Sequence, residues 1–162
     1  MFKLIQSKLP ERIQNPVHFL ALGFGSGLAP KAPGTFGTLA AIPLFLLMSY
    51  LPLWLYIVLI LAACRYGIYL CGKTAQDFDV HDDPSIVWDE FVGFWITMIA
   101  IPVSFTTVVL GFALFRLFDI WKPWPIDWID QKVSGGLGIM LDDVVAGLMA
   151  LGCLHLIHYF LL

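Results

Sequence analysis

The side chains best placed for chemistry in this 162-residue chain are carboxylates at the borders of apolar segments. The pair Asp89-Glu90 directly precedes one apolar segment, Asp119 follows it, and the pair Asp142-Asp143 precedes the last one. Carboxylate oxygens are among the ligands that Mg²⁺ prefers in proteins. Three or four of these acids, brought together by the fold, would form a magnesium site. Their convergence is a hypothesis, because no spacing rule requires it.

Cationic residues near these acids could bind a phosphate. Arg116 and Lys122 flank Asp119, and Lys31 lies in a glycine-rich stretch closer to the N-terminus. A metal ion and cations arranged around a phosphate are the components of phosphoryl transfer. Arg116 and Asp119 are also one helical turn apart, so they could instead simply pair with each other.

The acids have structural interpretations as well. Asp89 and Glu90 would suit the first turn of a helix, where the helix dipole favours negative charge. Asp142 and Asp143 would likewise suit the start of the last helix at a membrane surface. The acidic run 77–83 is interpreted as a solvated face. Its Asp-x-Asp spacing is that of a phosphatase nucleophile, but that motif requires a preceding β-strand, and an apolar helix precedes this run.

The glycine-rich stretch 23–38 leads into the first apolar segment. Its glycines and prolines are expected to exclude a regular helix, and Thr35 and Thr38 are candidate N-caps for the helix that follows. Such a loop presents free N–H groups and the positive end of the helix dipole, which together bind phosphate. Gly34, Thr35 and Thr38 are therefore candidate phosphate contacts. The alternative is a turn and cap at the membrane surface.

The composition predicts that membrane helices position these residues. Hydrophobic residues make up 59% of the chain and charged residues only 13%, and the mean hydropathy is +0.84. Soluble domains contain about 25% charged residues, so this much apolar surface indicates a bilayer. The net charge of −3 argues against nucleic acid as a partner, because nucleic-acid binding needs a basic surface.

Three stretches without charged residues mark the predicted membrane segments, because a charge at the bilayer centre is costly. The first stretch lies between Lys31 and Arg65 and contains Pro52. Proline lacks an N–H group and disfavours helix before it. The first stretch therefore predicts two helices, about Thr38–Tyr50 and Leu53–Cys71.

The second stretch, 91–115, is either one span kinked at Pro102 or a helical hairpin that turns at 102–104. We favour the hairpin, since it lets one site use both acidic clusters. The third stretch, Val144–Leu162, predicts one helix that begins near 137–142. Glycines at 135–138 and Ala146-Gly147 would let another helix approach closely.

The topology follows from the placement of charge. Lys3, Lys8 and Arg12 favour a cytoplasmic N-terminus, within a tail 1–20 that is either interfacial or solvated. Two hairpins would then return both acidic loops to the cytoplasm. The predicted fold class is an all-α, polytopic membrane protein with short helices, hairpins and acidic cytoplasmic-side loops, in a single membrane-embedded domain of residues 1–162.

With these residues in place, the chain resembles the phosphatidylglycerophosphatase A family. Four segments carry the resemblance: GFGSGLAPKAPGTFGTLAAIP (Gly23–Pro43), SIVWDEFVGFWITM (Ser85–Met98), FRLFDIWKPWPIDWID (Phe115–Asp130) and GGLGIMLDDVVAG (Gly135–Gly147). They follow one another in the family's order and cover most of the chain from Gly23 on.

The resemblance implies a helical, multi-pass enzyme of the bacterial inner membrane with its site on the cytoplasmic side. It implies Mg²⁺-dependent hydrolysis of phosphatidylglycerophosphate to phosphatidylglycerol and phosphate in phospholipid biosynthesis. The catalytic acids that it carries over are Asp89, Glu90, Asp119, Asp142 and Asp143. The metal ligands would be Asp89, Glu90, Asp119 and Asp143. Arg116, Lys122 and the Pro33-Gly34-Thr35 turn are its candidates for phosphate contact.

Two mechanisms remain open at this stage. Either an activated water attacks phosphorus in line, or one of the acids forms a covalent aspartyl-phosphate. Non-enzymatic alternatives are a cation transporter, which would place carboxylates deep in its spans, and a membrane scaffold, which would not need clustered acids. The sequence leaves the oligomeric state open.

Overall fold

The computed structural model describes residues 14–80 and 83–161, and every regular element in that part of the chain is a helix. The elements are α3 (Pro16–Ala21), η1 (Gly23–Leu28), α4 (Pro33–Met48), α5 (Leu53–Phe78), α6 (Trp88–Thr97), α7 (Phe105–Trp121), α8 (Ile126–Lys132) and α9 (Gly135–Leu161). The all-α prediction is confirmed. The predicted tail 1–20 is described only from residue 14 on, so the rest of it lies outside the described residues.

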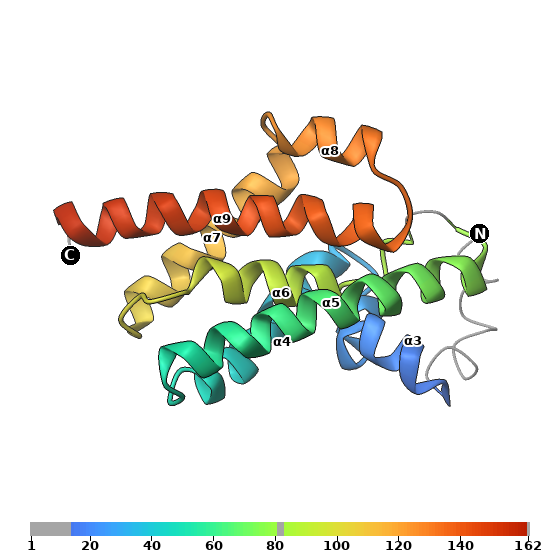
Figure 1. Ribbon diagram of the computed structural model, residues 1–162, viewed down its shortest axis with the longest axis horizontal. Coiled ribbons are helices and arrows are strands. Elements are labelled where there is room, and N and C mark those ends of the chain that lie inside the picture. Colours follow the sequence, from blue (N-terminus) through green and yellow to red (C-terminus); the bar gives the residue numbers. More distant parts are fainter. Residues whose placement is uncertain (1–13, 81–82, 162) are drawn as a thin grey trace.

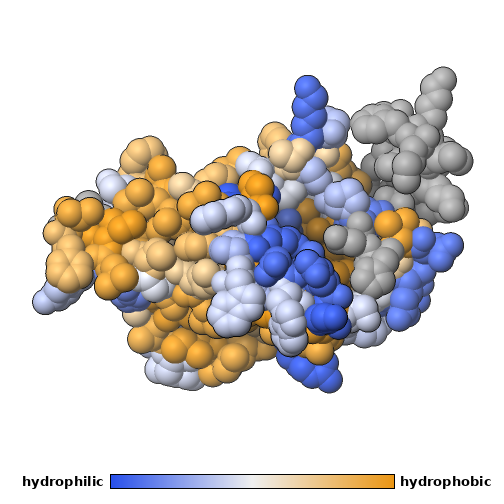
Figure 2. Space-filling model, turned by 90° about the horizontal axis from the view of Figure 1, so that it is seen from above, coloured by the Kyte–Doolittle hydropathy of each residue, from blue (hydrophilic) through white to orange (hydrophobic). Residues whose placement is uncertain are grey.

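Two of the described helices are long and apolar enough to cross a membrane. α5 has 26 residues and α9 has 27, whereas about 20 suffice to cross the hydrocarbon. α4 is also apolar but has only 16 residues. Hydrophobic side chains cover much of one end of the molecule in Figure 2, while hydrophilic ones gather nearer the other end. Both features support association with a membrane.

The first apolar stretch forms two helices, α4 and α5, as predicted, and Pro52 is the N-cap of α5. The predicted start of α4 was wrong, because the helix begins at Pro33, where proline's fixed φ suits the first helical position. Thr35 and Thr38 are therefore inside the helix and are not N-caps. The Thr38 hydroxyl donates a hydrogen bond to the Gly34 carbonyl at 2.8 Å.

The second apolar stretch is a hairpin, so the single kinked span is excluded. α6 and α7 run in opposite directions on either side of the turn at 98–104 (Figure 1). Ser104 caps α7 by accepting a hydrogen bond from the Thr107 N–H at 3.1 Å, and the Thr107 side chain accepts from the Ser104 N–H. This capping box gives α7 a defined start just beyond Pro102.

Helix α9 packs closely against α5 and α6 through glycines. A Cβ on Gly147 would lie 2.5 Å from the Gly93 carbonyl oxygen of α6, and one on Gly136 would meet backbone atoms of Gly72 in α5. The predicted close approach at both positions is confirmed. The predicted helix start was too late, because α9 begins at Gly135, which puts Asp143 about two turns inside the helix.

The helices are arranged so that their ends form two distinct regions. The turns after α4 and after α6 lie at the same end of the molecule as the C-terminal end of α9 (Figure 1). The N-terminal ends of α4, α6 and α9 lie toward the other end. The predicted acids stand in that second region, where four helices bring polar side chains together.

Candidate active site

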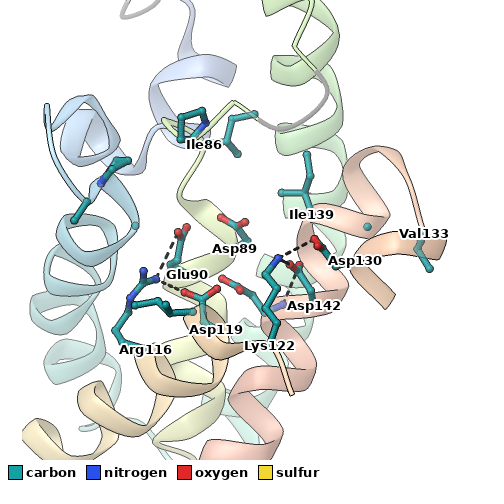
Figure 3. A pocket seen from close by; sticks show the side chains of 17 residues that line it. Ile86, Asp89, Glu90, Arg116, Asp119, Lys122, Asp130, Val133, Ile139 and Asp142 are labelled. Carbon is teal, nitrogen blue, oxygen red and sulfur yellow. Dashed lines mark hydrogen bonds and ion pairs between the residues drawn. The ribbon is translucent and has the colours of Figure 1, made fainter. Parts of the chain in front are cut away.

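A cavity of about 400 Å³ lies between α4, α6, α7, α8 and α9. It is lined by all five predicted acids and by three of the predicted phosphate contacts. These residues are Asp89, Glu90, Asp119, Asp142, Asp143, Gly34, Arg116 and Lys122. Figure 3 shows the side chains of Asp89, Glu90, Arg116, Asp119, Lys122 and Asp142 converging from separate helices. The hypothesis that the five acids converge is confirmed to the extent that all five line one cavity.

Three of the acids form a tight cluster. One carboxylate oxygen from each of Asp89, Glu90 and Asp143 lies within 4.8 Å of the other two. Each of the three also has a buried carboxylate oxygen without a hydrogen-bond partner, namely Asp89 Oδ1, Glu90 Oε2 and Asp143 Oδ2. Buried like charges without partners are unfavourable. A divalent cation would satisfy these oxygens, so the donor set fits Mg²⁺.

The electrostatics of the two α6 acids agree with this shortage of positive charge. Burial raises the pKa of Asp89 well above its ordinary value, and the neighbouring Glu90 and Asp143 carboxylates raise it further. Burial likewise raises the pKa of Glu90 to about 7. Burial disfavours the charged form of both side chains, whereas a bound cation would favour it.

Arg116 joins the two arms of the hairpin. Its Nη1 donates a hydrogen bond to Asp119 Oδ2 one turn along α7, and lies 3.7 Å from Glu90 Oε1 on α6. Its Nε is buried and has no hydrogen-bond partner. The predicted Arg116–Asp119 pair is confirmed, and it leaves the Nε–H of the guanidinium available to an anion.

Gly34 allows α4 to approach this ion pair. A Cβ at Gly34 would collide with Glu90 Oε1 and would lie 3.0 Å and 3.2 Å from the two Nη atoms of Arg116. The glycine therefore leaves room for two charged side chains, a reason that sequence reasoning missed when it assigned Gly34 to a phosphate-binding loop.

Asp119 differs from the other predicted metal ligands in its contacts. It lines the cavity and interacts electrostatically with Glu90. Its carboxylate, however, is paired with Arg116, and it is not part of the three-oxygen group. The ligand role of Asp119 stays a prediction.

Lys122 forms a second ion-paired group at the opposite side of the cavity. Its Nζ lies 2.8 Å from Asp130 Oδ1 on α8 and 2.8 Å from Asp142 Oδ2 on α9. Burial lowers the pKa of Lys122, but the hydrogen bonds to Asp130 and Asp142 raise it overall. Asp130 was not predicted, because its pairing joins three separate helices and leaves no sequence signal.

Three of the predicted phosphate contacts do not line the cavity. Lys31 is exposed outside it, Thr35 faces elsewhere on α4, and the Thr38 side chain is fully buried against its own helix. Thr35 and Thr38 are not presented by a loop, because residues 33–38 are helical, whereas Lys31 precedes the helix. Direct phosphate contact by these three residues stays a prediction.

The acidic run 77–83 is only partly a solvated face. Asp77 pairs with Lys73 at 2.5 Å and with His18 of α3 at 3.0 Å. Asp83 is only 8% exposed, and its Oδ1 accepts hydrogen bonds from the Ser85 N–H and hydroxyl. The solvated-face interpretation is therefore wrong for Asp83. His81 lies outside the described residues.

Comparison with known proteins identifies the family of the chain that forms this cavity. The family profile described as Phosphatidylglycerophosphatase A matches residues 19–158, which include every residue that lines the cavity. The chain belongs to the phosphatidylglycerophosphatase A family. Membership makes it a lipid phosphatase, a hydrolase of phosphoric monoesters, and confirms the resemblance found in the sequence.

Three relatives align with most of the chain. The Escherichia coli (strain K12) phosphatidylglycerophosphatase A is 53% identical over 91% of this chain and 87% of its own length. The Haemophilus influenzae phosphatidylglycerophosphatase A is 48% identical over 91% and 92%. A Bacteroides thetaiotaomicron protein provisionally named phosphatidylinositol-3-phosphatase is 39% identical over 79% and 84%. No solved structure matches the chain.

Proposed function

We propose that this chain is a Mg²⁺-dependent phosphatidylglycerophosphate phosphatase of phospholipid biosynthesis, and that Asp89, Glu90 and Asp143 hold the metal. The observation that carries the proposal is the set of three unpartnered carboxylate oxygens in the same cavity as the unpartnered Nε of Arg116. An anion-binding donor beside a cation-binding cluster suits a phosphate better than either feature would alone.

The chemistry divides among the residues of the cavity. Mg²⁺ bound by the three carboxylates would act as a Lewis acid toward the phosphoryl oxygens. Arg116 Nε donates a hydrogen bond to the phosphate and stabilises the charge of the transition state. Asp119 holds the guanidinium in place for that contact. Asp142 lies in the same cavity and is held by Lys122.

Two routes break the phosphorus–oxygen bond to the glycerol. In the route that we favour, one of the site's carboxylates takes a proton from a water that attacks phosphorus in line. The glycerol oxygen then leaves as an alcohol, with the proton returned by the carboxylic acid so formed. In the other route, a carboxylate attacks first and forms an aspartyl-phosphate that water then hydrolyses. Trapping of a labelled phosphoenzyme would identify the second route.

The membrane placement is part of the same proposal. Trp121, Trp124 and Trp128 are 70%, 78% and 55% exposed, and tryptophan prefers headgroup depth. The protein is multi-pass in the bacterial inner membrane, with the cavity on the cytoplasmic side and the acyl chains of the substrate in the bilayer beside the helices.

A comparison of substrates tests the proposed activity. Purified protein in detergent is expected to release phosphate from phosphatidylglycerophosphate faster than from phosphatidylinositol 3-phosphate, in the presence of Mg²⁺. The second lipid is the appropriate competitor because one relative carries a name based on it. Faster release from phosphatidylinositol 3-phosphate would assign a different headgroup to the same site. Release from neither lipid over a range of metals would refute the proposal.

A further inference from the structure

Among the described residues, two cationic side chains line the cavity, and each has its own set of partners. Arg116 contacts Asp119 and Glu90 on the α6–α7 hairpin. Lys122 contacts Asp130 of α8 and Asp142 of α9. The two cations share no carboxylate, and Figure 3 shows them on either side of Asp119. They therefore form two separate ion-paired groups.

The two positions differ in exposure. The Arg116 side chain is 14% exposed and that of Lys122 is 30% exposed. Lys122 also stands between the exposed rings of Trp121 and Trp124 in sequence. Because indole rings prefer headgroup depth in a bilayer, Lys122 is placed at the level of the phosphodiesters of membrane lipids. Arg116 lies deeper in the cavity, beside the carboxylate cluster.

Lys122 retains a donor for such a ligand. An ammonium group carries three N–H donors, and the contacts with Asp130 and Asp142 use two of them. These two carboxylates fix the position of Nζ while the third donor is available. Asp130 and Asp142 come from different helices, so the placement of Lys122 depends on how α8 and α9 pack rather than on α7 alone.

The substrate offers two phosphates of different chemistry. Phosphatidylglycerophosphate carries a terminal monoester and, across the glycerol, a phosphodiester that joins the headgroup to the diacylglycerol. We propose that Arg116 binds the monoester and Lys122 binds the phosphodiester, so that Lys122 is a specificity-determining residue. It favours lipids whose monoester is separated from the membrane by a diester-linked headgroup. This inference rests on the proposed function.

Each phosphate can be tested separately with a soluble fragment. Full-length protein in neutral detergent micelles hydrolyses phosphatidylglycerophosphate while glycerophosphoglycerol, a diester alone, or inorganic phosphate is added as a competitor. Lys122→Met is expected to raise the inhibition constant of glycerophosphoglycerol by about tenfold or more. It should change that of inorganic phosphate by less than about twofold. Arg116→Met is expected to give the reverse pattern.

Two further variants control for charge and folding. Lys132→Met removes a positive charge from an exposed position of α8 that does not line the cavity, and it should alter neither inhibition constant. Lys122→Gln keeps a hydrogen-bond donor for Asp142 but removes the charge, and it replaces Lys122→Met if that variant has a lowered melting temperature.

The outcomes separate the inference from the function on which it rests. Equal increases in both constants for the Lys122 variant, or no increase in either, would overturn the inference while leaving the phosphatase intact. Failure of glycerophosphoglycerol to inhibit the wild type would overturn it as well. Absence of phosphate release by the wild type would refute the proposed function itself, and the inference with it.

Discussion

Glu90 Oε1 and Arg116 Nη1 lie 3.7 Å apart although they stand on opposite arms of the α6–α7 hairpin. The contact exists because the chain reverses at 98–104 and returns the end of α7 to the start of α6. One acid of the candidate metal cluster is thereby joined to the deeper of the two cations. The hairpin is the element that assembles the site, and α4 and α9 close it from either side.

Substitution of Gly34 by alanine tests whether this contact matters for catalysis. The new Cβ would collide with Glu90 Oε1 and crowd the Arg116 guanidinium. Misplacement of catalytic groups by about 1 Å can lower the rate by about a hundredfold, so we expect a loss of that order in kcat/KM. The measurement is phosphate release, with the melting temperature followed in parallel. Loss of the fold together with the activity would argue against a local effect.

The glycine contact between α9 and α6 is expected to stabilise the fold. Gly147→Ala would place a Cβ 2.5 Å from the Gly93 carbonyl oxygen, and overpacking of this kind costs about 1–3 kcal/mol. Thermal unfolding in detergent should show a lowered midpoint. Gly152→Ala on the same helix is the matched control, because nothing lies within 4 Å of its Cβ position. A control that destabilises as much as Gly147→Ala would contradict the packing account.

The capping box at the hairpin turn gives a third prediction. Ser104→Ala removes the acceptor for the Thr107 N–H and should lower the free energy of unfolding by about 1 kcal/mol. Thr106→Ala, at an exposed position in the same turn, should have little effect. Equal melting temperatures for the two variants would show that the cap does not stabilise α7.

The pH dependence of stability in EDTA follows from the buried Glu90. Burial raises its pKa from 4.5 to about 7 in the folded protein. A raised carboxyl pKa means that the folded state binds the proton more tightly than the unfolded state. The stability linked to this group is therefore present below pH 4.5 and is lost as pH rises through about 7.

Melting temperatures measured in EDTA across that interval should fall more for the wild type than for Glu90→Gln, which cannot titrate. Saturating Mg²⁺ should oppose the decrease, because the metal binds the carboxylates in their charged form. Parallel curves for the two proteins would remove Glu90 as the source of the effect.

Much of the fold could be predicted from the distribution of charge and proline. The gap between Lys31 and Arg65 and the position of Pro52 were enough to place α4 and α5. The hydropathy pattern of 91–115 did not distinguish a hairpin from a single span. The hairpin was preferred because it brings the two acidic clusters to one site. Helix boundaries were the least accurate. Pro33 and Gly135 begin helices that their glycine-rich surroundings had indicated as loops, and α5 continues to Phe78, beyond its predicted end at Cys71.

The sequence predicted which residues form the candidate site better than it predicted how they are arranged. Carboxylates at the ends of apolar helices are detectable because they interrupt hydropathy, and Asp89, Glu90 and Asp143 were found in this way. Which oxygens cluster depends on the close packing of α9 on α6, which no local pattern encodes. Asp130 was missed because an exposed acid on a short helix has no distinguishing signal in the sequence.

The most direct test of the central claim is phosphate release from phosphatidylglycerophosphate measured as Mg²⁺ is titrated into EDTA-treated protein. The wild type and Asp127→Asn, which changes an exposed acid outside the cavity, should recover activity together. Asp143→Asn should remain at least about a hundredfold slower at every Mg²⁺ concentration while staying folded. Full activity in EDTA, or an Asp143→Asn variant as active as the wild type, would contradict the assignment of the carboxylate cluster as the metal site.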